Sequence, residues 1–399
     1  MNFSSEKTTE IQRRIKDFFV YLFSALLIGA ACGIIGALFA KSIGFVTGLR
    51  ETNDFIIYLL PLGGLVSVAL YKLTKTEGIG TLRVLESARG ESKTPILLLP
   101  VIFAASVITH LFGGSAGKEG AALQIGGAVA QSVAVITRAD EKKRSVYTVC
   151  GMAALFSAVF GTPVGACIFA LEVVFTGKVI SFAVLPVFVS SIVAHIISVA
   201  FGVSPERFEI SHVPDFGIEI LLKTFAVAII VAAVSAAFCF LLHRGENLFE
   251  KLIKNSFIRI FAGGCIIVVL TLVFGTDYNG GGIAVIERIF EEGNVLPQAF
   301  LLKIIFTVIT VSAGYRGGEI VPSLFIGSTL GAVLSPLLGM PTEFGAAVGM
   351  IAFFSGATNC PLAAAVLSTE LFGTDGFVLF AASAFAARAF SWKINLYNR

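Results

Sequence analysis

The stretch from Phe18 to Leu49 constrains this chain most, because it is apolar throughout apart from Lys41 and a few small polar residues. About 20 apolar residues are enough for a helix to cross a bilayer, so we expect a tilted or kinked span here. The apolar region of a cleaved signal sequence is only about 7–15 residues long, which excludes that alternative. A mean hydropathy of +0.89 extends the conclusion to most of the chain, which is predicted to be a polytopic membrane protein.

The charges indicate orientation more than they indicate a partner. A net charge of +3 without basic tracts gives no reason to expect binding to nucleic acid. Four basic residues precede the first span, which places the N-terminus in the cytoplasm by the positive-inside rule: Lys7, Arg13, Arg14 and Lys16. The six cysteines and four histidines show no metal-ligand spacing, so we expect free buried thiols, no metal and no cofactor.

The apolar segments fall into two halves. We expect a cytoplasmic segment at 1–16, a first transmembrane repeat at 17–201, a polar connector at 202–217 and a second transmembrane repeat at 218–399. Several apolar segments are too short to span a bilayer. Short, glycine-interrupted segments in matching places of two halves are typical of a transporter binding site, and they predict an all-α membrane fold with broken helices.

The two halves match residue by residue. A shift of 198 residues lays Gly151–Glu172 on Gly349–Glu370 without a gap, and a shift of 201 lays Gly117 on Gly318. Further upstream, Gly78–Ile79 falls near Gly282–Ile283. Three matches in the same order indicate an internal repeat. We expect the inverted kind, which brings corresponding broken helices together at the membrane midplane, although a parallel repeat stays open.

The segment Gly113–Gly126 places Lys118 and Glu119 among glycines and small residues, with apolar sequence on both sides. An ionisable side chain at membrane depth is costly, so Glu119 is a candidate functional residue. The glycines allow a broken helix whose backbone amides face a bound anion.

Three motifs resemble signatures of the CLC family of anion channels and proton-coupled anion antiporters. They are GKEGAALQIGG at Gly117–Gly127, GGEIVP at Gly317–Pro322 and GIG at Gly78–Gly80, and the two segments that run from a proline to Glu172 and Glu370 also fit. The resemblance implies a homodimer in which each subunit has its own anion pathway, built as an inverted repeat of tilted and partial helices. It also implies that Glu119 is the gating glutamate and proton carrier, and that the Tyr397 hydroxyl lines the inner anion site. The chain stops shortly after Tyr397, so no cytoplasmic regulatory domain is expected.

Departures from the family pattern narrow this expectation. Ile79 stands where chloride-selective members usually have serine, and Val173 stands where proton-coupled chloride exchangers commonly have a second glutamate. The other departures are Thr81, Leu82, Ala121, Glu319 and Ile320. This set resembles the bacterial fluoride-exporting branch, which implies a fluoride/proton antiporter of the bacterial plasma membrane that exports cytoplasmic fluoride.

The expected site has two acids, Glu119 and Glu319, the second on the inner proton or ion path. The expected anion-binding residues are Gly78, Ile79, Gly80, Gly117, Lys118, Gly120, Gly318, Ile320, Val321 and Tyr397. Phenylalanine rings present positive edges that can face an anion, and three lie close to the signatures: Phe112, Phe325 and Phe354.

Structural roles compete for several of these residues. Glu319 can pair with Arg316, and Tyr397 can be an interfacial anchor. Lys118 can pair with Glu119 or extend to the membrane interface. Glu172 and Glu370 are expected to make polar contacts at helix ends.

Other functions compete as well. A chloride/proton exchanger and a passive anion channel share the expected fold. An intramembrane hydrolase using Ser115 with His110 is the unrelated alternative, disfavoured because nothing orients the pair. We therefore expect no enzyme.

Overall fold

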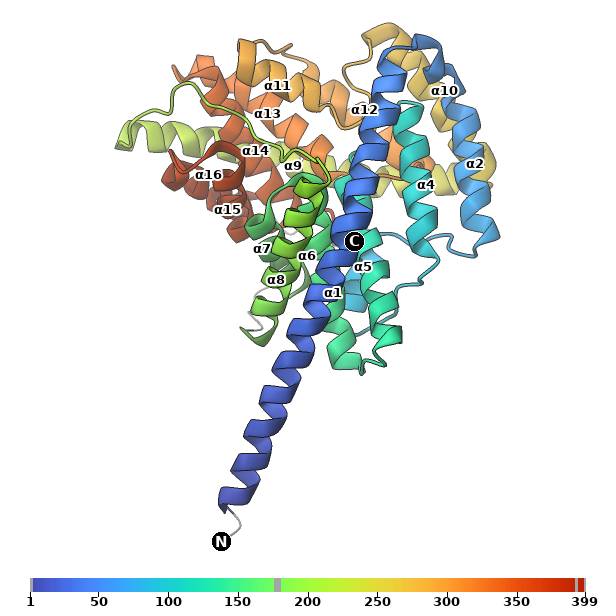
Figure 1. Ribbon diagram of the computed structural model, residues 1–399. Coiled ribbons are helices and arrows are strands. Elements are labelled where there is room, and N and C mark those ends of the chain that lie inside the picture. The colour runs from blue at the N-terminus through green and yellow to red at the C-terminus, as the bar shows by residue number, and fades with distance from the viewer. Residues whose placement is uncertain (1–2, 176–180, 392–393, 398–399) are drawn as a thin grey trace.

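The computed structural model describes residues 3–175, 181–391 and 394–397, with side chains described from residue 16 onward except at 181. Within these residues the chain forms sixteen α-helices and one short 3-10 helix, η1, and no β-strand (Figure 1). The first half contains α1 (Phe3–Glu51), η1 (Asp54–Leu59), α2 (Leu60–Leu73), α3 (Thr81–Ala88), α4 (Leu98–Leu111), α5 (Glu119–Ile136), α6 (Glu141–Phe160), α7 (Pro163–Val174) and α8 (Ser181–Ala200). The second half contains α9 (Ile218–Leu252), α10 (Ser256–Phe274), α11 (Ile283–Glu292), α12 (Ala299–Ala313), α13 (Ile320–Leu337), α14 (Thr342–Thr358), α15 (Pro361–Phe372) and α16 (Phe377–Phe390).

Helix α1 is the longest element, and its N-terminal part extends away from the other helices (Figure 1). Its 49 residues rise about 70 Å at 1.5 Å per residue, which exceeds the thickness of a bilayer. The helix is continuous, so its length beyond the thickness of a bilayer is not accommodated by a kink. Gly29 and Gly33 lie against Ser190 and Ile197 of α8, so these two glycines allow α1 and α8 to pack closely.

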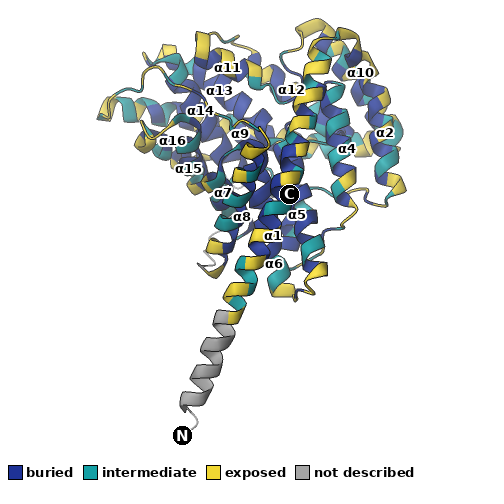
Figure 2. Cartoon of the chain, in the orientation of Figure 1, coloured by how far each residue is buried: buried dark blue, intermediate teal, exposed yellow. Residues whose placement is uncertain are grey.

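Seven helical segments of the described chain are long and apolar enough to cross a membrane. Five apolar helices are shorter, at 10–17 residues: α4, α7, α12, α15 and α16. Helices α5, α6, α13 and α14 carry long runs of buried residues and form the interior (Figure 2). The mixture of full and partial spans is that of a multi-pass membrane protein built with broken helices.

Corresponding helices of the two halves cap each other. The Glu172 carboxylate, at the end of α7, accepts hydrogen bonds from the amides of Leu362 and Ala363 at 3.2 and 2.8 Å. Its repeat partner Glu370, at the end of α15, accepts from the amides of Val164 and Gly165 at 2.9 and 2.7 Å. Each acid therefore satisfies orphan donors at the first turn of the other half's helix. This exchange confirms the expected helix-end role and is the arrangement that a two-fold axis between the halves produces.

The connector at 202–217 is free of helix and runs across both halves. The Glu206 amide donates to the Phe160 carbonyl of α6, and the Phe208 amide donates to the Leu371 carbonyl of α15. All six cysteines are free, and five of them are buried, as expected.

Candidate functional site

The site begins where two broken helices meet. Gly117, before α5, and Gly318, before α13, form an antiparallel backbone bridge in which the Gly117 amide donates to the Gly318 carbonyl at 2.7 Å. The Gly318 amide donates back to the Gly117 carbonyl at 2.6 Å. These two glycines are the residues that the repeat places on each other. Their pairing in opposite directions is what an inverted repeat requires.

This bridge corrects one expectation. The amides of Gly117 and Gly318 were expected to face an anion, but each donates to the carbonyl oxygen of the other glycine. The first helical amides with carbonyl acceptors are those of Ala122 in α5 and Ser323 in α13. The N–H groups of the preceding first turns, including those of Gly120 and Val321, are therefore the ones left for an anion at the junction.

Gly120 allows the two helix starts to approach each other. A Cβ atom at Gly120 would lie 2.6 Å from the Gly318 Cα, and one at Gly318 would collide with the Gly120 nitrogen. Both neighbours are backbone atoms that cannot rotate away. The junction therefore requires glycine at both positions.

Glu119 is the first residue of α5 and is fully buried. The backbone amides of Lys118 and of Glu119 itself lie nearby, but neither carboxyl oxygen accepts a hydrogen bond from a described residue. A buried carboxyl group without donors is expensive unless it is protonated or moves. Its position at the junction suits a group that alternates between two states.

Lys118 corrects a second expectation. Its ammonium does not pair with Glu119 and instead forms an ion pair of 3.1 Å with Glu206 of the connector. Only 20% of the Lys118 side chain and 17% of the Glu206 side chain are exposed. The sequence predicted Lys118 as a site residue but not Glu206. The only feature of Glu206 in the sequence is that it is an acid within the polar connector at 202–217.

Glu319 is the residue that precedes α13, and Ile320 and Val321 behind it are 1% exposed. The Arg316 guanidinium lies over the Tyr71 ring at 4.6 Å, and no ion pair joins it to Glu319 within the described chain. The purely structural Glu319–Arg316 pair is thus absent.

Tyr397 is held near the core by its own segment. The Leu396 amide donates to the Ala357 carbonyl of α14 at 2.8 Å, and the Tyr397 amide donates to the Asn395 side chain at 2.9 Å. The tyrosine is half-buried and packs against the hydrophobic core.

The Gly78–Gly80 segment precedes α3, which packs beside α5. Gly78 has a φ of +73°, and Ile79 packs against the core. The Gln124 side chain of α5 donates to the Thr81 hydroxyl at the start of α3 at 3.2 Å. The structure therefore places the first signature against the helix that begins with Glu119.

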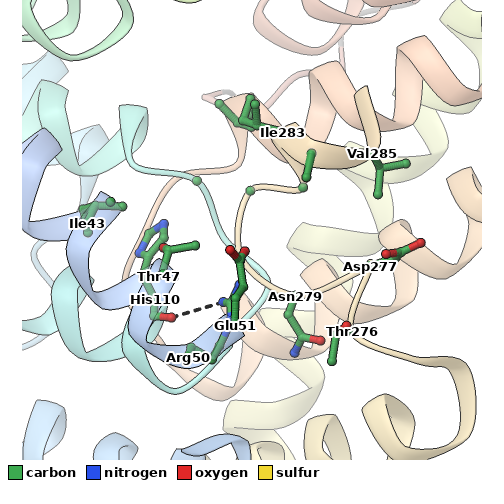
Figure 3. A pocket seen from close by; sticks show the side chains of 18 of the residues that line it. Ile43, Thr47, Arg50, Glu51, His110, Thr276, Asp277, Asn279, Ile283 and Val285 are labelled. Atoms are coloured by element: carbon green, nitrogen blue, oxygen red, sulfur yellow. Dashed lines mark hydrogen bonds and ion pairs between the residues drawn. The ribbon is translucent and has the colours of Figure 1, made fainter. Parts of the chain in front are cut away.

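A cavity of about 1110 Å³ reaches this junction from the end of α1 that is remote from the N-terminus. Glu119, Lys118, Glu206 and Val321 are among the residues that line it. Arg50 from α1, His110 from α4 and Asn279 from the loop before α11 gather around it (Figure 3). A cavity with charged side chains in its wall that reaches a buried carboxyl group at two helix N-termini can admit water, protons and a small anion.

The hydrolase alternative has no geometry to support it. The Ser115 hydroxyl shares a hydrogen bond of 3.0 Å with Thr307, and the His110 Nδ1 contacts the Ser106 carbonyl at 2.8 Å. No hydrogen bond joins Ser115 to His110 among the described residues, so the pair is not a nucleophile with its base.

The candidate phenylalanines separate in space. Phe112 lies against Gly63, and Phe354 packs on Phe169 with ring centroids 5.4 Å apart. Phe325, in α13, lies edge-to-face with Tyr278 at 6.4 Å. Phe325 also lies against Gly282, a residue that lines the cavity, whereas Phe354 belongs to a separate aromatic cluster.

Fold and site together define a membrane anion transporter with paired broken helices. The family model described as voltage gated chloride channel matches residues 62–391, so the chain belongs to the CLC family, whose members are transporters and channels. It is 33% identical over 387 residues to the "Chloride/fluoride channel protein" of Pseudomonas syringae pv. tomato, covering 95% of this chain and 85% of the relative.

Solved structures agree on the fold. A CLC-type fluoride/proton antiporter superposes with a TM-score of 0.91 at 30% identity, covering 95% of this chain and 97% of the other. A slow cyanobacterial Cl⁻/H⁺ antiporter superposes with a TM-score of 0.80 at 18% identity, covering 94% and 96%. The chain is thus a CLC-family anion/proton transporter with the inverted-repeat fold.

Proposed function

We propose that this protein exchanges fluoride for protons and exports cytoplasmic fluoride across the bacterial plasma membrane as a homodimer. The observation that carries the proposal is Glu119, a fully buried carboxyl group without a hydrogen-bond partner among described residues, at the junction of two helix N-termini. The four regions expected from the sequence, 1–16, 17–201, 202–217 and 218–399, are proposed as its domain organisation.

Glu119 suits coupled exchange because its two protonation states act oppositely on an anion. The carboxylate repels the anion and competes for first-turn amides, whereas the protonated acid can donate a hydrogen bond or withdraw. Anion binding therefore favours proton binding at Glu119, and proton binding favours the anion by linkage. Exchange follows if the binding site cannot switch between the two faces of the membrane while it is empty and Glu119 is deprotonated.

Glu319 is proposed as the second acid of the proton or ion path. It has no ion pair with Arg316 among the described residues, and it directly follows Gly318 of the backbone bridge, as Glu119 follows Gly117 by two residues. Glu119 and Glu319 therefore flank one bridge from opposite halves. A proton can be held on either side of the junction.

Fluoride is the proposed anion. It is small and strongly hydrated, so its site must replace water with short hydrogen bonds, which first-turn amides and Tyr397 can supply. Ile79 removes the hydroxyl expected of chloride-selective members. Both a relative named for fluoride and a structural neighbour described as a fluoride/proton antiporter support this choice.

A passive anion channel is the second candidate, because that relative is named a channel. A chloride/proton exchanger of the same fold is disfavoured by Ile79 and Val173 together. Two acids on the path favour coupling over passive conduction.

The test is anion flux from liposomes that contain purified protein. We expect fluoride to leave far faster than chloride, measured with ion-selective electrodes on one preparation. Equal rates for the two anions would refute the choice of fluoride.

A further inference from the structure

The loop between α10 and α11 forms part of the wall of the large cavity and contains three consecutive glycines. Gly280, Gly281 and Gly282 line the cavity in succession, and a Cβ atom at Gly281 would lie 3.0 Å from Val321 at the Glu119 junction. Gly280 and Gly282 have φ values of +57° and +87°, which glycine adopts without strain. Such a triple-glycine turn can present successive backbone amides to an anion.

Lys303 of α12 fixes the direction of this loop. Its ammonium donates to the carbonyl oxygens of Tyr278 at 3.1 Å and Gly280 at 2.7 Å. The carbonyl and the following N–H of a trans peptide point in opposite directions, and the described chain contains no cis peptide. Drawing the Gly280 carbonyl toward Lys303 therefore turns the Gly281 amide the other way, toward the side that lines the cavity.

That amide is left free. The Gly280 amide donates to the Gly114 carbonyl and the Asn279 amide to the Thr276 carbonyl. No backbone acceptor for the amides of Gly281 or Gly282 occurs within the described residues. Buried or half-buried amides normally have a partner, so these two are available to a bound group.

Two basic side chains flank the loop. Lys303 is fully buried, and its contacts are two carbonyls and the Phe325 ring at 5.1 Å, with no carboxylate partner among the described residues. On the other side, an Arg50 guanidinium nitrogen lies 3.3 Å from the Cβ position of Gly280, and the same guanidinium forms an ion pair of 3.4 Å with Glu51. A buried cation without an anionic partner, as Lys303 is, is costly, and a bound anion would supply the missing charge.

The internal repeat points to the same loop. Gly282–Ile283 is the counterpart of Gly78–Ile79, the first of the anion-site motifs. An inverted repeat places counterparts at opposite ends of a pathway. The Gly280–Gly282 loop thus lies at the cavity end of the route whose other end carries Gly78–Gly80.

We propose that the Gly280–Gly282 loop is a second binding site for a small monovalent anion, at the cavity end of the pathway. Arg50 and the free glycine amides contact the anion, and Lys303 is a positioning residue that orients the loop and contributes charge. The proposal rests on the proposed function for the identity of the transported ion, fluoride. It adds an outer anion-binding site on the side of the membrane remote from the N-terminus.

The test compares fluoride saturation from the two faces of the membrane. Right-side-out and inverted vesicles from cells that express the protein expose opposite faces to added sodium fluoride. For Lys303→Met and Arg50→Gln we expect the half-saturating fluoride concentration to rise about tenfold on the cavity face, as loss of a charge-assisted contact implies. It should stay within about twofold on the face of the N-terminus, because the contacts there are unchanged.

Arg288→Gln is the matched control. Arg288 lines the same cavity and, like Arg50, has a carboxylate partner, Asp277 at 2.6 Å, but it does not lie against Gly280, Gly281 or Gly282 as Arg50 does, so its substitution should leave both faces unchanged. Arg50→Lys, which keeps the charge, should restore most of the cavity-face affinity.

The outcomes separate the two proposals. Equal changes on both faces, or no change on either, would overturn the outer site. If Lys303→Met does not fold, Arg50→Gln decides by the same comparison. Absence of fluoride transport by the unaltered protein in either vesicle would instead refute the proposed function.

Discussion

Substituting Gly120 by alanine tests how tightly the two helix starts are joined. The added Cβ atom would lie 2.6 Å from the Gly318 Cα, about 0.8 Å inside the 3.4 Å at which ordinary contact begins. Because the obstacle is backbone, α5 and α13 must separate. Overpacking of this kind costs about 1–3 kcal/mol, and weakening the two bridge hydrogen bonds adds about 1 kcal/mol. We expect a loss of about 2–4 kcal/mol in the free energy of unfolding.

The assay is thermal unfolding of purified protein in detergent, paired with fluoride flux in liposomes. A loss of that size should lower the apparent Tm by roughly 4–8 °C and reduce flux, since the junction holds Glu119. Gly48→Ala is the control, because its Cβ atom meets nothing within 4 Å in α1. An unchanged Tm and full flux for Gly120→Ala would refute the requirement for glycine at the junction.

Three further substitutions test the acids. Glu119→Gln should abolish proton coupling, because the amide cannot carry the proton; continued proton pumping, followed with a pH electrode, would contradict the gating role. Glu319→Gln should also lower the number of protons moved per fluoride, whereas unaltered coupling would return Glu319 to a structural role. Glu370→Gln should lower the apparent Tm by several degrees, because two charge-assisted hydrogen bonds to the start of α7, worth about 1.5–3 kcal/mol each, are weakened. Its control is Glu219→Gln, an exposed acid of α9 whose substitution should leave the Tm unchanged; equal effects of the two would contradict the capping account.

Much of the fold could be predicted from the sequence because it depends on repeated, local patterns. Apolar length indicated the membrane, and the matched segments around Glu172 and Glu370 indicated a repeat. The structure shows why that match exists, since each acid caps the other half's helix. Glu119 was found because a buried acid among glycines is chemically conspicuous.

The site's partners could not be predicted because they depend on contacts between distant segments. Nothing in the sequence near Lys118 points to Glu206, which lies 88 residues away. The backbone bridge between Gly117 and Gly318 could not be predicted either. The same glycine pattern is compatible with amides that bind an anion and with amides that donate to the carbonyl oxygens of another backbone segment. The buried Lys303 gave no signal because a single lysine in an apolar helix does not reveal which carbonyls it contacts.

Uphill proton movement driven by fluoride tests the central claim most directly. Liposomes with purified protein are loaded with fluoride and placed in a fluoride-free solution, with the membrane voltage clamped and the proton gradient set against the expected exchange. We predict that protons enter the liposomes against their gradient as fluoride leaves. Fluoride efflux without proton movement would contradict coupled exchange at Glu119 and establish a passive pathway instead.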